Sequence, residues 1–423
     1  MRFRSRAATV RGTVRAPPSK SYTHRAFLLA ALSEGSCLVS NPLLSEDTEA
    51  TLAGIEAFGA EVRRKGDAVR ISSPGLSPPP NEIDARNSGT TLRLLTGTAA
   101  LVRGTTVLTG DDSLKKRPMG PLLEALRGLG ADARARGGDG RPPVEVTGPL
   151  RGGTVSLPGS VSSQFLSSLL LACPLASGET RVHVLPPIVS GPYVDITRHL
   201  VRAFGAVVES HGNDFRIPGG QRYRTTDLAV PGDFSSAAFP LVAAAITRGD
   251  VTVEGLDLAA PQGDRRIADL LGAFGASVAQ RPGALRVRGE SLRAQTVDVG
   301  ATPDLFPVLA VLASRARGQS RFVNGAQLRL KESDRIETTV ALLRAMGAEA
   351  VGTPDGCVVR GPAELHGARV DSRGDHRILM AAAVAGLVAS DPVEITDPWC
   401  FRVSYPSFLD DLRALGAEME VVP

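Results

Sequence analysis

The feature that most constrains this chain is a helix ending that recurs six times. In each copy an amphipathic, leucine-rich run closes on an apolar residue followed by Gly and Ala, and successive copies are 69 to 75 residues apart. A Gly placed directly after a helix adopts the left-handed backbone that ends it without a Cβ clash, and the segment that follows is typical of a strand. The glycines are Gly59, Gly130, Gly205, Gly275, Gly347 and Gly416. The spacing predicts six similar units.

A second class of helix keeps the same spacing. Each member opens on a polar or glycine-rich cluster and continues into an almost wholly apolar run, which predicts a helix buried inside its domain, whereas the glycine-ended helices should lie outside. The openings are at Ser19, Asn87, Ser162, Asp233, Thr302 and Asp375. Since 423 residues exceed what one core usually supports, the six units are expected to divide into two domains of three.

Composition narrows the function classes. The net charge is only +4, aromatic residues make up 4 %, and no block of five or six like charges occurs, which argues against nucleic-acid binding. Four widely spaced cysteines show no metal-ligand or CxxC pattern, so we expect reduced, mostly structural thiols. No apolar run is long enough to cross a bilayer, and the first residues lack the apolar core of a signal peptide. We therefore expect a soluble cytoplasmic protein.

The positions of the lysines indicate an anion site. Only five of the 48 basic residues are Lys, and two of these, Lys20 and Lys331, stand at predicted helix starts. Unsatisfied backbone N–H groups and the positive end of the helix dipole favour phosphate or carboxylate there.

Eight short segments carry a specific resemblance. In chain order they are PPSKSYTHR, NSGTTLR, LKKRP, SVSSQF, SGPYVDIT, LRLKESDRIE, GDHR and SYPSF, and they run from residue 17 to residue 408. Together they resemble the signatures of the 5-enolpyruvylshikimate-3-phosphate synthases, within the enolpyruvyl transferase family.

The resemblance implies an α/β (α+β) fold of two domains, each built of three βαβαββ repeats around buried inner helices, an inside-out α/β barrel. Residues 17–231 would form one domain, and residues 1–16 with 232–423 the other, with the active site in the cleft between them. It also implies a transferase of chorismate and aromatic amino-acid biosynthesis. The enolpyruvyl group of phosphoenolpyruvate would pass to the 5-hydroxyl of shikimate 3-phosphate with release of phosphate. No cofactor or metal is expected, and the two small molecules would be the partners of a monomer.

By resemblance, the catalytic residues would be Asp304 as proton acceptor for the hydroxyl, Glu332 as proton shuttle at C3 of the enolpyruvyl group, and Lys20, which reaches both ligands. The residues expected to bind shikimate 3-phosphate are Lys20, Ser21, Arg25, Ser162, Ser163, Gln164, Ser190, Tyr193, Asp304, Gln327 and Lys331. Those expected to bind phosphoenolpyruvate are Lys20, Asn87, Gly89, Thr90, Arg117, Gln164, Arg335, Arg377 and Arg402. Several of these polar residues would serve equally as ordinary helix caps. His376 is as well explained by structure as by chemistry.

Two positions depart from the family pattern. Gln327 stands where many members have Asn, four residues before Lys331. Val403 stands where a phosphoenolpyruvate-binding Lys is usual, and we hypothesise that Arg402 supplies the missing cation.

Two alternatives stay open. The sister enzyme that transfers enolpyruvyl to UDP-N-acetylglucosamine generally has a reactive Cys in the loop that here reads GDDSLKKRP, without Cys, and its first motif tends to lack the spacing of Ser21 and Arg25. A nonenzymatic anion- or RNA-binding protein of related fold would keep the cationic helix ends, but it would have no reason to place Asp304 and Glu332 among them.

Overall fold

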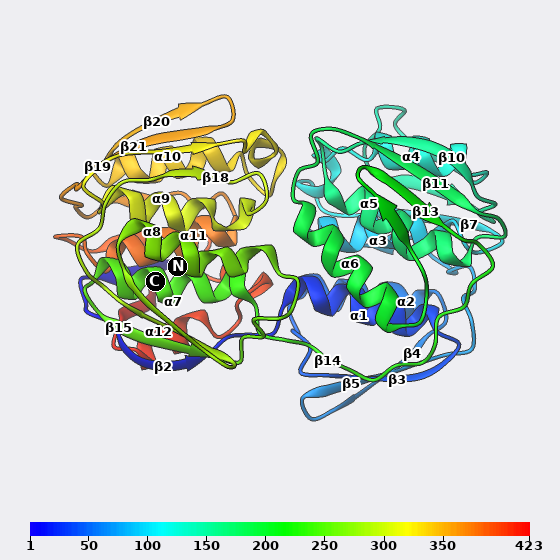
Figure 1. The fold of residues 1–423 in the computed structure, drawn as a ribbon, viewed down its shortest axis with the longest axis horizontal. Coiled ribbons are helices and arrows are strands. Elements are labelled where there is room, and N and C mark those ends of the chain that lie inside the picture. The colour runs from blue at the N-terminus through cyan, green and yellow to red at the C-terminus, as the bar shows by residue number, and fades with distance from the viewer. The chain divides into compact units, whose positions relative to one another are not determined.

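The computed structural model describes residues 1–423 and divides into two compact units (Figure 1). Unit 1 comprises Met1–Pro17 and Pro231–Pro423, and unit 2 comprises Pro18–Val230. The chain therefore starts in unit 1, builds the whole of unit 2, and returns to complete unit 1. Each unit combines helices with small sheets, so the predicted mixed α/β class is confirmed.

All six sheets have four strands and one topology. In each, the first two strands in sheet order are parallel and the remaining neighbours are antiparallel. The sheets of unit 2, in strand order, are β14 (Leu228–Ala229), β3 (Gly35–Ser40), β5 (Ala68–Ser73), β4 (Glu61–Lys65); β6 (Ile83–Asp84), β7 (Thr105–Thr109), β9 (Val144–Thr147), β8 (Asp132–Ala135); and β10 (Gly153–Pro158), β11 (Thr180–Leu185), β13 (Asp214–Ile217), β12 (Glu209–His211).

Unit 1 repeats this arrangement with strands from both ends of the chain. Its sheets are β22 (Arg369–Val370), β23 (Val393–Ile395), β1 (Arg2–Arg6), β24 (Glu418–Val422); β2 (Arg11–Arg15), β15 (Asp250–Glu254), β17 (Ala284–Arg288), β16 (Ser277–Arg281); and β18 (Thr296–Asp298), β19 (Gly318–Val323), β21 (Gly356–Gly361), β20 (Glu349–Thr353). Because β1 pairs with β24, the first and last strands of the chain lie side by side.

The repeat is therefore βαβαββ, with one helix after each of its first two strands. Three sheets consist of four strands that are consecutive in the chain, and a fourth combines β22, β23 and β24 with the N-terminal strand β1. In the other two sheets, β14 and β2 are distant in sequence from their partner strands and lie just before the chain passes from one unit to the other. A sequence period of about seventy residues is thus one sheet with its two helices.

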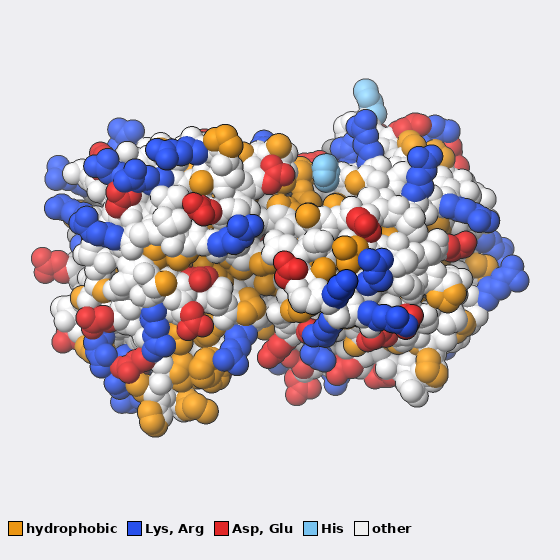
Figure 2. Space-filling view, turned by 90° about the horizontal axis from the view of Figure 1, so that it is seen from below, with side chains coloured by type: hydrophobic (Ala, Val, Ile, Leu, Met, Phe, Trp, Pro, Cys, Tyr) orange, Lys and Arg blue, Asp and Glu red, His pale blue; other side chains and the backbone are white.

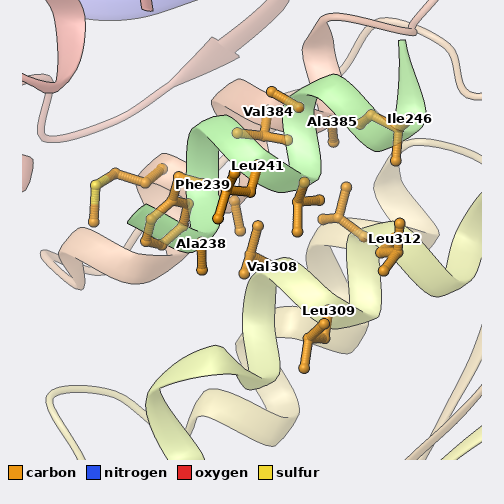
Figure 3. Close-up of a cluster of buried hydrophobic side chains, with 14 of the residues drawn as sticks. Ala238, Phe239, Leu241, Ile246, Val308, Leu309, Leu312, Val384 and Ala385 are labelled. Atoms are coloured by element: carbon orange, nitrogen blue, oxygen red, sulfur yellow. The ribbon is translucent and has the colours of Figure 1, made fainter. Parts of the chain in front are cut away.

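The first helix of each repeat is the buried one, as predicted. These helices are α1 (Lys20–Leu32), α3 (Gly89–Ala99), α5 (Ser163–Ala172), α7 (Phe234–Ile246), α9 (Phe306–Ser314) and α11 (His376–Gly386). In unit 1 every residue of α7, α9 and α11 is buried, and Figure 3 shows their aliphatic side chains interlocking. Such helices are apolar all round because they have no solvent-facing side.

The second helix of each repeat ends as the sequence predicts. The helices are α2 (Glu46–Ala57), α4 (Gly120–Gly128), α6 (Gly191–Ala203), α8 (Ile267–Phe274), α10 (Arg335–Ala345) and α12 (Phe408–Ala414). The six glycines that follow them all have positive φ, between 84° and 103°. The sequence predicts that these glycine-ended helices lie outside the inner helices. That prediction is incomplete for α2 and α6, which also pack against inner helices of unit 2 and have several buried residues.

Short 3-10 turns complete the chain: η1 (Leu114–Lys116), η2 (Cys173–Leu175), η3 (Gly263–Arg266), η4 (Pro303–Leu305), η5 (Ala326–Leu330) and η6 (Cys400–Val403). No helix is both long and apolar enough to cross a membrane. The four cysteines are free thiols, three of them buried. On the face drawn in Figure 2, cationic and anionic side chains are interspersed.

Candidate active site

In unit 2, the inner helices leave only their first turns accessible. Every residue of α1, α3 and α5 is buried except Lys20, Ser21, Thr90 and Gln164. All four were assigned to the site from the sequence. The polar start of each otherwise apolar helix is therefore the part of it that a ligand could reach.

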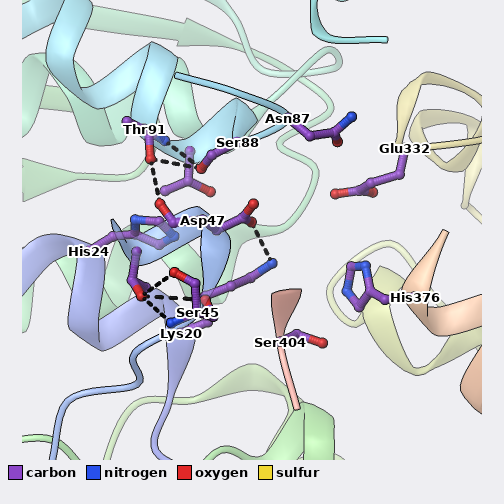
Figure 4. A network of polar contacts seen from close by, with 12 residues as sticks. Lys20, His24, Ser45, Asp47, Asn87, Ser88, Thr91, Glu332, His376 and Ser404 are labelled. Carbon is purple, nitrogen blue, oxygen red and sulfur yellow. Dashed lines mark hydrogen bonds and ion pairs between the residues drawn. The ribbon is translucent and has the colours of Figure 1, made fainter. Parts of the chain in front are cut away.

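Lys20 opens α1 and pairs with Asp47 in the first turn of α2. The Nζ to Oδ2 distance is 2.9 Å, and both side chains are largely buried (Figure 4). Asp47 had no assigned role in the sequence interpretation. The only signal was that an acidic residue starts the helix after the first motif, which an ordinary capping preference explains equally well.

Arg25 lies one turn further along α1, with 1 % of its surface exposed. Its guanidinium donates to the Thr197 hydroxyl (2.7 Å), the Ser21 carbonyl (2.9 Å), the Ser167 hydroxyl (3.2 Å) and the Tyr193 carbonyl (3.2 Å). Every one of these acceptors is neutral. Burial lowers the pKa of Arg25 to about 10, which still leaves it charged near neutral pH. A buried cation without a carboxylate is costly unless an anion joins it.

The starts of α5 and α6 hold the residues predicted around the shikimate phosphate. Ser162 is the N-cap of α5, and its hydroxyl accepts from the Gln164 N–H at 3.3 Å. Ser190 caps α6 in the left-handed region, with φ 54°, an uncommon conformation for serine that is held at a buried position. Tyr193 lies in the first turn of α6, next to Arg25, and Ser163 follows Ser162.

Five of the residues predicted for phosphoenolpyruvate, Asn87, Gly89, Thr90, Arg117 and Gln164, come together around the start of α3. Arg117 Nη2 donates to Asn87 Oδ1 at 3.0 Å, and Gln164 Nε2 donates to the Thr90 hydroxyl at 2.9 Å. A Cβ on Gly89 would lie 2.8 Å from Arg117 Nη1. A larger residue here would therefore displace the guanidinium of Arg117.

One residue that belongs with this group had no assigned role. Arg93, the last residue of NSGTTLR, is buried, donates to Gln164 Oε1 at 2.7 Å and lies over the Phe165 ring. The motif itself carried the signal. The sequence did not show whether an arginine one turn inside an apolar helix points toward the start of that helix.

Unit 1 holds a compact ionic network at the starts of α10 and α11. Arg335 donates to Asp375 (2.9 Å), Asp304 (2.7 Å) and Glu332 (2.8 Å), and Arg377 donates to Asp304 at 3.1 Å. Burial alone would lower the pKa of Arg335, but the carboxylates of Asp375, Glu332 and Asp304 raise it well above its ordinary value. The two expected proton-transfer residues thus share one guanidinium.

This network bears on the role expected of Arg335. Its Nε and both terminal nitrogens already donate to carboxylates, and it is 1 % exposed. Binding phosphoenolpyruvate in bidentate fashion would require the ligand to replace one of those carboxylates. Arg377 contacts both the carboxylate and the backbone carbonyl of Asp304.

The remaining assigned residues of unit 1 lie beside this network. Gln327 is buried in η5 and donates to the Gly300 carbonyl at 3.3 Å, while its Oε1 has no hydrogen-bond partner. Lys331 ends η5. His376 is buried as the first residue of α11, directly after its N-cap Asp375.

Arg402 is exposed in η6, with its guanidinium 4.1 Å from the centre of the Trp399 ring. Val403, next to it, is half-buried. Compensation by Arg402 therefore requires the side chain to leave a cation–π contact worth about 0.5–1 kcal/mol at an exposed site, a modest cost.

No group of three or more His, Cys, Asp or Glu side chains is arranged to hold a metal ion. The polar groups at the helix starts are instead guanidinium, ammonium, hydroxyl and amide groups in unit 2, and carboxylates with guanidinium groups in unit 1. The first set suits anions, and the second set can hold and release protons.

Comparison with known proteins agrees with this chemistry. Residues 5–412 match the sequence model of a family described as EPSP synthase (3-phosphoshikimate 1-carboxyvinyltransferase). The proteins named 3-phosphoshikimate 1-carboxyvinyltransferase from Methanocorpusculum labreanum and Methanothrix thermoacetophila are each 48 % identical to this chain, over 97 % of both chains. That of Halobacterium salinarum is 46 % identical over 97 % of this chain and 98 % of its own.

Solved structures agree as well. An EPSP synthase from Acinetobacter baumannii superimposes with a TM-score of 0.83 at 32 % identity, covering 99 % of this chain and 100 % of that one. A second structure of the same enzyme gives a TM-score of 0.84 at 31 % identity. The expected two-domain, inside-out α/β fold is therefore confirmed.

Proposed function

Because this chain belongs to the EPSP synthase family, we propose that it transfers the enolpyruvyl group of phosphoenolpyruvate to the 5-hydroxyl of shikimate 3-phosphate, releasing phosphate. The helix starts of unit 2 would bind the anionic groups, and the network of unit 1 would move protons. Both sets of residues would act on one reaction.

The reaction adds and then eliminates across C2 and C3 of phosphoenolpyruvate. Glu332 gives a proton to C3 while Asp304 takes the proton of the 5-hydroxyl, whose oxygen bonds to C2. In the second step Glu332 takes a proton back from C3, the double bond reforms, and the bond from C2 to the phosphate oxygen breaks. Since one carboxyl must give a proton while the other takes one, two carboxyls in different environments are needed.

The cations would stabilise the charge that develops and leaves. Lys20 and Arg377 are placed at helix starts, and Arg117, which follows η1, contacts Asn87 just before α3. Preorganised donors at these places act on phosphate and carboxylate without further rearrangement. Ser21, Ser162 and Ser190 would complete the shikimate phosphate site as hydroxyl donors.

The observation that carries the proposal is Arg25, a buried guanidinium whose acceptors are all neutral. A structural arginine at this depth would be paired with a carboxylate, as Arg335 is. Arg25 therefore fits a residue that awaits an anionic ligand.

The proposal is tested by phosphate release and by binding. The wild-type protein should release phosphate only when both substrates are present. Arg25→Met should weaken shikimate 3-phosphate binding by about 30-fold or more, as expected for loss of a buried charged contact worth 2 kcal/mol or more. Arg63→Met, which removes an exposed arginine of β4, should leave binding unchanged. Turnover with UDP-N-acetylglucosamine in place of shikimate 3-phosphate, or no turnover at all, would contradict the proposal.

We also propose that the enzyme works as a monomer in the cytoplasm, without nucleic-acid or membrane partners. The dispersed charge of the face in Figure 2 supports the absence of a nucleic-acid surface. Light scattering after size-exclusion chromatography, at the concentration used for the assay, tests the monomer.

A further inference from the structure

A chain of buried polar side chains runs across three helices beneath the site of unit 2 (Figure 4). His24 Nδ1 lies 2.7 Å from the Thr51 hydroxyl, which lies 2.7 Å from the Thr91 hydroxyl. Each of these residues is 1 % exposed. They come from α1, α2 and α3 respectively, and they lie in or just below the first two turns.

Both ends of this chain of bonds lead to groups already placed at the site. The Thr91 hydroxyl lies 2.7 Å from the Ser88 hydroxyl and 3.0 Å from the Asp47 carbonyl. Ser88 is the N-cap of α3, and Asp47 is the carboxylate that holds Lys20. Lys20 and His24 are four residues apart on α1 and so share one face of that helix. The contacts therefore form a closed hydrogen-bonded loop that links Lys20, through Asp47, to Thr91 at the start of α3.

From this hydrogen-bonded loop we propose that His24, Thr51 and Thr91 are positioning residues, which set where Lys20 stands relative to the start of α3. The inference rests on the proposed function, because it assumes that Lys20 and the Asn87 to Thr90 turn act on one substrate. α2 packs against both α1 and α3, so the helix that carries Thr51 also sets the separation of the other two. Hydrophobic packing alone leaves a helix free to slide by a fraction of an ångström, whereas hydrogen bonds specify one register.

The geometry also assigns the direction of the hydrogen bonds. Burial, with the nearby charges of Lys20 and Arg25, lowers the pKa of His24 well below its ordinary value, so the imidazole is neutral and carries one N–H. Nε2 of His24 has no hydrogen-bond partner. A bare nitrogen is cheaper to leave unpaired there than an N–H, which places the proton on Nδ1. His24 then donates to Thr51, Thr51 donates to Thr91, and Thr91 donates to Ser88 or to the Asp47 carbonyl.

The role differs from a catalytic one. None of the three side chains reaches solvent or a ligand, so their effect must pass through Lys20 and the N-cap of α3. Small displacements of positioned groups are costly, about 100-fold in rate for a displacement of 1 Å. The displacement should affect phosphoenolpyruvate most, because Lys20 on α1 and Gly89 and Thr90 on α3 are all proposed to bind it. It should affect shikimate 3-phosphate less, because none of the residues proposed to bind that substrate lies on α3.

The first test is Thr91→Val, which keeps the shape of the side chain and removes the hydroxyl. Thr96→Val is its matched control, since Thr96 lies on the same helix, is fully buried, and its hydroxyl reaches only the Leu92 carbonyl, at 2.7 Å. We expect kcat/KM for phosphoenolpyruvate to fall about 10- to 100-fold in Thr91→Val. The Kd of shikimate 3-phosphate should stay within about threefold, and Thr96→Val should match the wild type in both. Equal kinetics of the two variants, or an equal loss for both substrates, would overturn the proposal.

Thr51 provides a second pair that does not depend on the folding of Thr91→Val. Thr51→Ser keeps the hydroxyl and should keep kcat/KM within about threefold of the wild type, whereas Thr51→Val should show the loss expected for Thr91→Val. A loss in Thr51→Ser as large as that in Thr51→Val would assign the effect to packing and overturn the proposal.

The second measurement needs no variant activity. In ¹⁵N spectra of the wild-type imidazoles, His24 should appear as the neutral Nδ1–H tautomer and stay neutral as the pH is lowered from 8 to about 5.5. His24→Asn identifies its signals by their disappearance. A proton on Nε2, or titration near pH 6.5, would contradict the assigned direction of the bonds. The wild type could show these spectra and yet no turnover with the two substrates. That result would contradict the proposed function and would leave the assigned hydrogen bonds supported.

Discussion

At the scale of single residues, buried arginines have different partners in the two units. Arg25 and Arg335 are equally buried arginines, yet one contacts only neutral oxygens and the other three carboxylates. Burial penalises both charges, so the partners decide what each residue is for. An arginine saturated by carboxylates organises its neighbours, and one without them is available to an anion.

Gly89 is the residue whose change should separate the two substrates most cleanly. A Cβ at this position would meet the guanidinium of Arg117 at 2.8 Å and that of Arg93 at 3.4 Å. Because the ends of arginine side chains are flexible, Gly89→Ala should fold but displace Arg117. We expect the KM for phosphoenolpyruvate to rise about tenfold, equivalent to about 1.4 kcal/mol, with shikimate 3-phosphate affinity unchanged. Steady-state kinetics with each substrate varied in turn would measure this, and an unchanged KM for phosphoenolpyruvate would contradict it.

Asp264 gives a pH dependence of stability. It is buried in η3, accepts from the Ser235 hydroxyl through Oδ2, and has no partner at Oδ1. Burial, with the Asp304 charge next in importance, raises the pKa of Asp264 to about 7. In an unfolded chain the carboxyl titrates near ~3.9. Between these values the folded protein binds more protons than the unfolded one, so this residue makes stability fall as the pH rises from about 4 to about 7.

Asp264→Asn should remove that dependence, since the amide cannot ionise. We expect the variant to gain stability relative to the wild type as the pH rises from 5 to 8, with a slope of at most ~1.4 kcal/mol per pH unit. Thermal unfolding at each pH would measure the gain. Asp269→Asn, at an exposed position of α8, is the control. Its stability should change with pH in parallel with that of the wild type. A parallel profile for Asp264→Asn as well would show that Asp264 is ionised in the folded protein throughout.

At the scale of elements, the helix that ends in glycine is the repeated part. All six copies take a left-handed backbone at the glycine after the helix, in both units. The helix therefore stops at a residue chosen by local backbone energetics, whatever the tertiary surroundings are. This explains why the recurrence is visible in the sequence even though the strands that follow differ in composition.

Two glycines at the end of α8 give a matched test of this point. Gly275 has φ 103°, and a Cβ on it would lie 2.7 Å from the Ser291 carbonyl oxygen. Gly272 lies inside the helix with open space around it. We expect Gly275→Ala to destabilise the protein by about 1–2 kcal/mol, the cost of a left-handed non-glycine residue. Gly272→Ala should stabilise it by about 0.8–1.0 kcal/mol, the difference in helix propensity.

Thermal or urea unfolding of the two glycine variants beside the wild type would measure both signs. Changes in stability of opposite sign would support the view that local backbone energetics end the helix. Shifts of the same sign would mean that the surroundings of α8, and not the backbone conformation of each glycine, control its stability.

At the scale of the whole molecule, two units of similar construction each carry a distinct part of the proposed chemistry. Unit 2 has Lys20, Arg25 and the serine hydroxyls, and unit 1 has Asp304 and Glu332 together with Arg335 and Arg377. The chain crosses between them only near Pro17 and near Val230. The proposed reaction needs both parts.

We expect shikimate 3-phosphate to make the protein more compact. Ligand-driven closure excludes water and completes a catalytic site, so the radius of gyration should fall when the ligand is added. Small-angle scattering with and without ligand measures this. Arg25→Met, with weakened binding, is the control and should require more ligand for the same change. A radius of gyration that does not respond at saturating ligand would contradict closure.

The sequence by itself determined the features set by local energetics and by periodicity. The positive-φ glycines, the N-caps at Ser19, Ser162, Asp233 and Asp375, and the alternation of buried and partly exposed helices follow from backbone preferences and apolar patterning, which act within a few residues. The family motifs located the residues at the helix starts, and with them the proposed substrates.

Only the tertiary structure decided which of those residues are paired. That Lys20 is held by Asp47, that Arg335 is enclosed by three carboxylates while Arg25 meets none, and that His24, Thr51 and Thr91 join three helices all depend on groups distant in sequence. It also decided that α2 is partly an inner helix. Burial and hydrogen bonding between such groups are set by how the helices pack, which no local pattern encodes.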